Sequence, residues 1–141
     1  MLIPDTNVLL YAVDTDSAFC ASAGSWLDSA LSGRETVGLA PNVLLGFVRI
    51  STNPRIFAEP LSTDEAFDHA GAWLGAAPSV LIAPGPDHLE RMRELLNSAG
   101  AAGNLTSDAH LAALAIEHRA TLVSYDRDFD RFDGLSFEYL R

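Results

Sequence analysis

Residues 2–13 read LIPDTNVLLYAV, and this opening stretch decides how the fold begins. An apolar run stops at Asp5, so we expect a short strand that ends at this acid. Residues 7–13 can then form a short helix. A strand followed at once by a helix is typical of an α/β fold, and here a carboxylate stands at the turn between them.

The rest of the chain continues this alternation of strands and helices. Apolar spacing and capping signals predict further helices over residues 17–31, 41–50, 62–74, 87–97 and 106–118. Apolar runs between turn residues predict further strands over residues 36–39, 80–83, 121–125 and 135–139, with a turn or short helix over 129–132. We therefore expect an α/β fold with a small, mostly parallel sheet and helices on both faces. No repeat or linker divides the chain, which predicts a single domain over residues 1–141.

Two of the predicted helices carry recognisable starting signals. Ser62 and Glu65 form an S-x-x-E capping box. Thr106 follows the small-residue loop 100–104, and we expect it to cap the next helix. That helix is rich in alanine on almost every side, which predicts that it is largely buried.

The composition excludes several chemistries. The nine basic residues are all arginine, against 19 acidic residues, so the formal charge is −10. Without lysine there is no Schiff base and no phosphate-loop lysine. The acidic balance argues against a general basic coat for nucleic acid, but not against a nuclease whose site holds cations. A single cysteine, Cys20, excludes an intrachain disulfide and a zinc–thiolate cluster.

The ends and apolar runs of the sequence bear on its location. The N-terminal stretch MLIPDTN has no basic segment before an apolar core, so no signal peptide is predicted. The longest apolar run, residues 8–13, is far shorter than the ~20 residues of a membrane span. We therefore expect a cytoplasmic protein without a membrane partner.

Four acids fall where an α/β sheet places its ligands. Asp5 ends the first predicted strand, Asp126 follows the strand 121–125, and Asp128 comes two residues later. Asp108 lies in the first turn of the helix after the small-residue loop. Ligands of open parallel sheets bind outside the carboxyl ends of the strands, where these acids are expected to converge.

Each acid also has a purely structural interpretation. Asp5 can cap the helix that follows, Asp108 suits the positive end of a helix dipole, and Asp126 and Asp128 suit a turn. Four carboxylates at one edge, however, repel one another unless protons or cations neutralise them. Mg²⁺ or Mn²⁺ with carboxylate and water ligands is the natural solution.

Four motifs along nearly the whole chain resemble a known family. They are LIPDTNVLLY at residues 2–11, LLGFVRISTNPRIF at 44–57, SDAHLAALA at 107–115 and LVSYDRDF at 122–129. In this order and spacing they resemble the PIN domain, in particular the VapC-type toxins of bacterial toxin–antitoxin pairs. The resemblance implies a three-layer α/β/α fold and a ribonuclease that depends on Mg²⁺ or Mn²⁺.

The resemblance also assigns roles to particular residues and partners. Its metal-holding acids fall on Asp5, Asp108 and Asp126, and Asp128 is a further catalytic candidate. Neighbouring polar positions, which orient the acids or the attacking water, fall on Thr6, Asn7 and Ser124. An RNA substrate, a VapB-type antitoxin with a basic segment and a homodimer are implied in the same way.

One position departs from the family pattern. Gly46 stands where the family normally has a glutamate, and glycine inside a helix costs ~1 kcal/mol relative to alanine. Three explanations are open: drift toward a weak enzyme, a substitution that silences a toxic product, or another acid such as Glu35 or Glu59 that supplies the charge. We expect this version to bind metal poorly and to cleave slowly or not at all.

Other residues near the motifs suggest substrate contacts and alternatives. Arg49, Arg55 and Arg127 are candidate RNA contacts, although each is also an ordinary surface arginine. The four histidines show no metal-ligand spacing and are interpreted as solvated or packed side chains. Two other folds with acidic strand ends are disfavoured: a receiver domain needs a lysine, and a haloacid-dehalogenase-type phosphatase needs D-x-D where this chain has Asn7. A non-catalytic module that only binds a basic protein partner is the remaining alternative.

Overall fold

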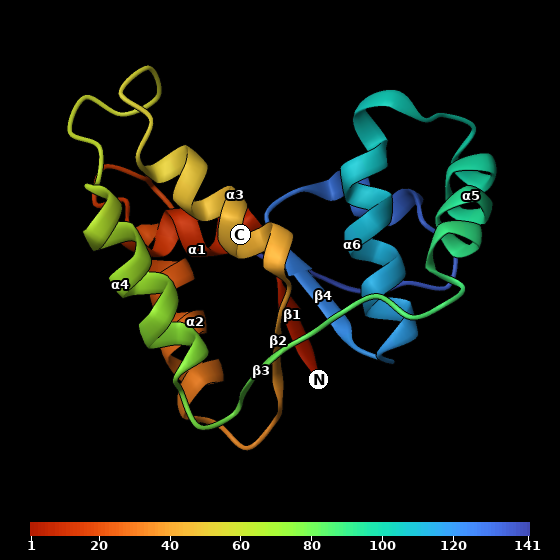
Figure 1. Cartoon of the computed structure of the whole chain (residues 1–141), viewed down its shortest axis with the longest axis horizontal. Helices are drawn as coiled ribbons and strands as arrows, with labels where there is room; N and C mark the ends of the chain where they lie inside the picture. The colour runs from red at the N-terminus through yellow and green to blue at the C-terminus, as the bar shows by residue number, and fades with distance from the viewer.

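A single five-stranded sheet, all of it parallel, forms the centre of the molecule in the computed structural model, which describes residues 1–141 (Figure 1). The strands are β1 Leu2–Pro4, β2 Val37–Leu39, β3 Ser79–Leu81, β4 Thr121–Ser124 and β5 Ser136–Tyr139. The helices are α1 Thr6–Val13, α2 Cys20–Ser32, α3 Pro41–Ser51, α4 Thr63–Leu74, α5 His88–Ala99 and α6 Thr106–Glu117. Two short 3-10 helices, η1 Gly103–Leu105 and η2 Arg127–Arg131, complete the chain.

The strand order β3-β2-β1-β4-β5 determines where the helices lie. The first two crossovers run outward from β1 to β3, and the third returns past β1 to β4. Because such crossovers are right-handed, a reversal of direction moves the connecting helices to the opposite face. Figure 1 shows α1 to α4 on one side of the sheet and α5 and α6 on the other. The predicted α/β fold with helices on both faces is confirmed, and its sheet is wholly rather than mostly parallel.

Proline affects the pairing of the central strand. The β1–β2 register is a single pair, Leu2 with Val37, whereas β1 pairs with β4 as far as Pro4 with Val123. Pro4 has no N–H to donate, so it cannot extend the ladder toward β2. The backbone N–H of Asp5 then donates to the carbonyl of Val123. The carboxyl ends of β1 and β4 therefore stay hydrogen-bonded at the point where the strand order reverses.

The core lies on both faces of this sheet. Ile3, Val37, Leu39 and Leu122 are fully buried in the strands. On the α5–α6 side, α6 buries an almost unbroken run over residues 109–115, as its composition predicted. A buried helix of small residues can lie close to the sheet, and this fixes the position of its N-terminus.

The helix starts agree with the sequence in two places and differ in one. Asp5 caps α1 by accepting from the backbone N–H of Thr6, and the Ser62–Glu65 capping box is present with both hydrogen bonds. The prediction that Thr106 caps α6 is wrong, because Thr106 is already the first helical residue. Its preceding residue, Leu105, has no side chain that can cap, and η1 leads into the helix instead.

No helix of the chain combines the length and the apolar composition that crossing a membrane needs.

Candidate active site

A buried serine connects the ends of β1 and β4. Ser124, the last residue of β4, is 0% exposed, and its hydroxyl donates to Oδ2 of Asp5 over 2.7 Å. The hydroxyl oxygen of Ser124 in turn accepts from the side-chain amide of Asn7 over 2.9 Å and from the backbone N–H of Asp126 over 3.0 Å. The other oxygen of Asp5 accepts from the backbone N–H of Thr6 over 2.7 Å. Residues that lie about 120 positions apart in sequence thus form one fixed polar network.

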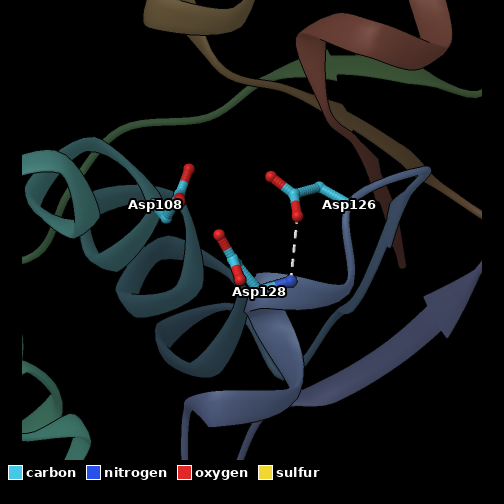
Figure 2. Close-up of side chains that lie close together, drawn as sticks. All are labelled: Asp108, Asp126 and Asp128. Carbon is cyan, nitrogen blue, oxygen red and sulfur yellow. Dashed lines mark hydrogen bonds between the residues drawn. The ribbon is translucent and has the colours of Figure 1, made fainter.

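Three further carboxylates meet beside this network. Asp108 comes from the first turn of α6, Asp126 from the end of β4 and Asp128 from η2 (Figure 2). One ligand atom from each lies within 4.8 Å of the others. Asp126 also accepts from the backbone N–H of Asp128 over 2.9 Å, which holds η2 against the strand end. This trio does not include Asp5, so the closest grouping differs from the expected set of Asp5, Asp108 and Asp126.

The acids of the site affect one another electrostatically. Burial raises the pKa of Asp108 to about 6, and the charges of Asp5, Asp126 and Asp128 add to this increase. Burial also raises the pKa of Asp5, against the hydrogen bonds from Ser124 and Thr6, and the charge of Asp126 adds to it. The cluster is therefore short of positive charge, which is the condition that a bound cation relieves.

Few cationic side chains balance this cluster. The one ion pair that involves it joins Arg131 to Asp128 at 3.9 Å, and both side chains are more than half exposed. Asp5, Asp108 and Asp126 form no ion pair. Carboxylate oxygens are the ligands that Mg²⁺ and Mn²⁺ prefer, so the residues present fit such an ion.

Gly46 lies directly against the first residue of α1. A Cβ built on Gly46 would stand 3.0 Å from Oγ1 and 3.3 Å from Cγ2 of Thr6. The hydroxyl of Thr6 has a long, 3.4 Å hydrogen bond to the carbonyl of Val43 in the same helix α3. The missing side chain thus lets α3 approach α1 closely, which gives this helical glycine a packing reason. A longer side chain at position 46 would point toward the residue that follows Asp5.

Neither of the two substitute acids joins the site. Glu35 accepts from the N-terminal amine of Met1 over 3.1 Å, at the amino end of β1, whereas the acids gather at its carboxyl end. Glu59 lines a cavity with Leu10 and Asp14 at the far end of α1. Asp5 caps the near end of α1, so at 1.5 Å per residue the helix separates Glu59 from Asp5 by roughly 10 Å. The explanation that Glu35 or Glu59 supplies the missing charge is therefore wrong.

The candidate RNA-binding arginines lie on the surface of the chain. Arg49 in the last turn of α3, Arg55 in the following turn and Arg127 in η2 are all exposed. None of them forms an ion pair, and the guanidinium of Arg127 lies 4.7 Å from the ring centre of Tyr139. Their role as RNA contacts stays a prediction.

A histidine pair was missed by the sequence reasoning. His88 is 6% exposed, and its Nδ1 lies 2.8 Å from a carboxylate oxygen of Glu117. Its Nε2 lies 2.7 Å from Nδ1 of His110. Burial lowers the pKa of His110, the neighbouring His88 lowers it further, and Glu117 opposes this. His88 comes from α5, and His110 and Glu117 come from different turns of α6, so no local spacing in the sequence predicts this contact.

Comparisons with known proteins show the family of the chain. The sequence profile of the PIN domain matches residues 2–135. Ribonuclease VapC37 of Mycobacterium tuberculosis (strain ATCC 25618 / H37Rv) is 46% identical over 138 residues, which cover 98% of this chain and 96% of the relative. Ribonuclease VapC33 of the same strain is 40% identical over 137 residues, with 97% and 96% covered.

Solved structures show the same fold at lower identity. A chain of VapBC2 from Rickettsia felis, bound to a DNA fragment from the promoter, superposes with a TM-score of 0.70 at 20% identity, covering 98% of this chain and 97% of its own. The Mycobacterium tuberculosis toxin VapC20, which cleaves the sarcin–ricin loop, superposes with a TM-score of 0.67 at 17% identity, covering 92% and 93%. The profile match and the 40–46% identity to relatives over nearly their whole length establish that this chain belongs to the PIN domain family, among its VapC-type members.

Proposed function

We propose that this chain is a metal-dependent endoribonuclease of a toxin–antitoxin pair, built as one domain over residues 1–141. The observation that carries the proposal is the meeting of Asp108, Asp126 and Asp128 within 4.8 Å at the carboxyl ends of the parallel strands. The names of the relatives, Ribonuclease VapC37 and Ribonuclease VapC33, support RNA as the substrate. The activity would take place in the cytoplasm, where RNA is available.

Asp5, Asp108 and Asp126 are the proposed ligands of Mg²⁺ or Mn²⁺, with Asp128 as an additional one. When bound, such an ion lowers the pKa of an attacking water and offsets the charge that develops on the phosphate. The raised pKa of Asp108 supports this assignment, since a cation would replace the proton that the neighbouring acids favour.

The supporting polar residues would orient the acids. Ser124 fixes one oxygen of Asp5, and Asn7 fixes Ser124 while it also accepts from the backbone N–H of Tyr125 over 3.2 Å. The side chain of Thr6 contacts α3 rather than an acid. Thr6 therefore orients Asp5 through its backbone N–H, which donates to the carboxylate, and not through its hydroxyl. A carboxylate held at both oxygens loses little freedom when it binds a ligand.

Gly46 would weaken this enzyme. Four carboxylates remain without the family glutamate, so we expect lower occupancy by metal first and slower cleavage as a consequence. The same residue favours a second candidate function, a non-catalytic module that binds only a basic protein partner. The two differ in one respect: only the enzyme cleaves RNA in a metal-dependent way.

A VapB-type antitoxin and a second copy of the chain are the proposed protein partners. A basic antitoxin segment would be attracted to the acidic edge, and salt would weaken the encounter. A groove of about 360 Å³ between α3, α4 and β3, with the exposed side chains of Leu45, Phe67 and Leu81, supports an apolar interface with one of them. The mass of the purified chain in solution tests the homodimer.

The experiment that tests the proposed function is an RNA cleavage assay with total cellular RNA. We expect cleavage with Mn²⁺, none with EDTA, and none from the Asp126→Asn variant. The conservative variant Asp130→Asn changes an exposed acid of η2 outside the site and should retain activity. Cleavage that persists in Asp126→Asn would point to a contaminating nuclease, and no cleavage even in Gly46→Glu would support the binding module.

A further inference from the structure

Three aromatic rings form a cluster beside the acidic site. The ring centres of Tyr11 and Phe19 lie 5.2 Å apart, those of Tyr11 and Tyr125 also 5.2 Å, and those of Phe19 and Tyr125 4.8 Å. Tilted and edge-on rings at such distances attract one another beyond their apolar burial. The three rings therefore behave as one packed unit.

This aromatic cluster is attached to the residues of the site. Tyr125 stands between Ser124 and Asp126 in the chain, and its backbone N–H donates to the side chain of Asn7. Tyr11 lies four residues after Asn7 in α1, which places both on the same face of the helix, one turn apart. The position of the rings relative to the acids is thus set by the same strand end and the same helix.

Phe19 is the member of the cluster that faces solvent. Its side chain is 39% exposed, yet its backbone is held on both sides. Its N–H donates to Oγ of Ser17 over 3.1 Å, and its carbonyl accepts from the hydroxyl of Ser22 over 3.2 Å. The Ser22 oxygen also lies 2.5 Å from the hydroxyl oxygen of Tyr125. An exposed ring that is already ordered loses little entropy when a flat ligand stacks on it.

The charge of the chain indicates what kind of contact RNA binding needs. Nucleic-acid binding usually draws on phosphate contacts from lysine and arginine, but this chain has nine arginines, no lysine and a net charge of −10. Stacking of bases on aromatic rings provides affinity without positive charge and accepts any base. Single-stranded RNA, whose bases are free to stack, is the substrate form that such a ring can bind.

We propose that Phe19, supported by Tyr11 and Tyr125, stacks on an unpaired base of the RNA next to the scissile phosphate. The proposal rests on the ribonuclease function above and adds a substrate-positioning residue to it. Trp26 and Trp73 do not compete for this role: Trp73 is 8% exposed and packs on Phe47, and Trp26 packs against the core.

The test is equilibrium binding of a fluorescently labelled, single-stranded RNA of mixed sequence in Mn²⁺, with Asp126→Asn built into every chain, the otherwise unaltered one included, so that the RNA stays intact. We expect Phe19→Leu to bind about tenfold more weakly and Phe19→Tyr to bind like the unaltered chain, because tyrosine still stacks. Leu89→Ala is the control for loss of an exposed apolar side chain, since Leu89 is 79% exposed on α5 and belongs neither to the acidic site nor to the apolar groove. The loss in Phe19→Leu should be equal at low and high salt, because stacking releases no counterions.

An abasic scan sharpens the assignment. One abasic position in the RNA should weaken binding to the unaltered chain, and the same position should have no effect on Phe19→Leu. If Phe19→Leu binds RNA as tightly as the unaltered chain, the stacking role is overturned and the ribonuclease proposal stands. If the unaltered chain itself binds no RNA, both are overturned. Thermal unfolding of each variant shows whether a loss reflects folding, and Phe19→Tyr remains informative if Phe19→Leu unfolds.

Discussion

The hydroxyl of Ser124 donates a 2.7 Å hydrogen bond to Oδ2 of Asp5 and thereby joins the carboxyl ends of β4 and β1. Both residues are held by further bonds, Asp5 by the N–H of Thr6 and Ser124 by Asn7. Burial raises the pKa of Asp5, and the hydrogen bond from Ser124 acts in the opposite direction and lowers it. An acid at the centre of a parallel sheet is thus kept in one orientation and closer to its ionised form.

Ser124→Ala removes this donor without changing the strand. We expect the free energy of unfolding to fall by about 1–3 kcal/mol, because a buried acceptor and the Asn7 amide lose their partner. The measurement is urea unfolding at neutral pH. Ser136→Ala on the neighbouring strand β5 is the control, since its hydroxyl bond to Thr121 is exposed and should contribute within about 0.5 kcal/mol. Equal losses of unfolding free energy in the two variants would show that the Ser124–Asp5 hydrogen bond stabilises the chain no more than an exposed one.

Asp108→Asn should change how the stability of the metal-free protein depends on pH. The pKa of Asp108 in the folded chain, about 6, lies above the ordinary value of 3.8, so folding favours the protonated carboxyl. That stabilisation is complete below pH 3.8 and is lost as the pH rises through about 6. The neutral amide escapes the loss, so the variant should unfold roughly 2–4 °C higher at pH 7.5 and no higher at pH 4.

Saturating Mn²⁺ should reverse this order at pH 7.5. Metal that binds only the folded state stabilises it in proportion to its affinity, and Asp108→Asn removes a proposed ligand. The unaltered chain should then gain several degrees in unfolding temperature and the variant little. A variant that gains as much as the unaltered chain would exclude Asp108 from the metal site.

Gly46→Glu tests the family position together with its close neighbour Thr6. The new carboxylate should raise the affinity for Mn²⁺ and the rate of RNA cleavage, but its Cβ would press on the Thr6 side chain at 3.0–3.3 Å. We therefore expect a loss of about 1 kcal/mol in stability from the contact, recovered when Thr6→Ala is added. Isothermal titration with Mn²⁺ and urea unfolding measure the two effects separately.

Gly46→Ala is the matched control for this experiment. It adds the same Cβ and about 1 kcal/mol of helix propensity, but no carboxylate. Its metal affinity should therefore equal that of the unaltered chain, with and without Thr6→Ala. If Gly46→Glu binds Mn²⁺ no better than Gly46→Ala, position 46 is not a lost ligand.

His88→Leu tests the contact between α5 and α6. The side chains of His88 and Glu117 are 7% and 13% exposed, so removing the imidazole leaves a buried carboxylate with only the N–H of Gly85 as its partner. We expect a loss of about 2–3 kcal/mol in urea unfolding, partly restored by the additional change Glu117→Leu. His118→Leu removes an exposed bond to the carbonyl of Ala83 and should cost less than about 1 kcal/mol. If His88→Leu loses no more unfolding free energy than His118→Leu, the buried His88–Glu117 contact does not stabilise the chain.

Much of the fold follows from patterns that are local in sequence. The strand 2–4 and the helix that Asp5 caps can be predicted because an apolar run, an acid and a helical pattern follow one another directly. Strand ends and helix starts then place Asp5, Asp108 and Asp126 at one edge, since parallel strands share the direction of their carboxyl ends. The boundaries are less certain from sequence, as Thr106 shows, because the turn η1 replaces a side-chain cap.

The remaining features depend on distances between elements, which no spacing in the sequence encodes. Asp128 is expected at the same edge, but its place in the closest group of acids, where Asp5 is expected, depends on how η2 folds back on the end of β4. The closeness of Gly46 to Thr6 depends on how α3 packs on α1. The aromatic cluster likewise combines residues that are more than 100 positions apart.

The central claim is that Asp5, Asp108, Asp126 and Asp128 hold a divalent cation, and a crystal soaked at high Mn²⁺ concentration tests it most directly. Anomalous scattering identifies the ion without reference to activity. We predict an anomalous peak in contact with the carboxylates of Asp108 and Asp126, and the loss of this peak in crystals of Asp126→Asn. A soaked crystal with no peak between these side chains, or with peaks only elsewhere on the surface, would contradict it.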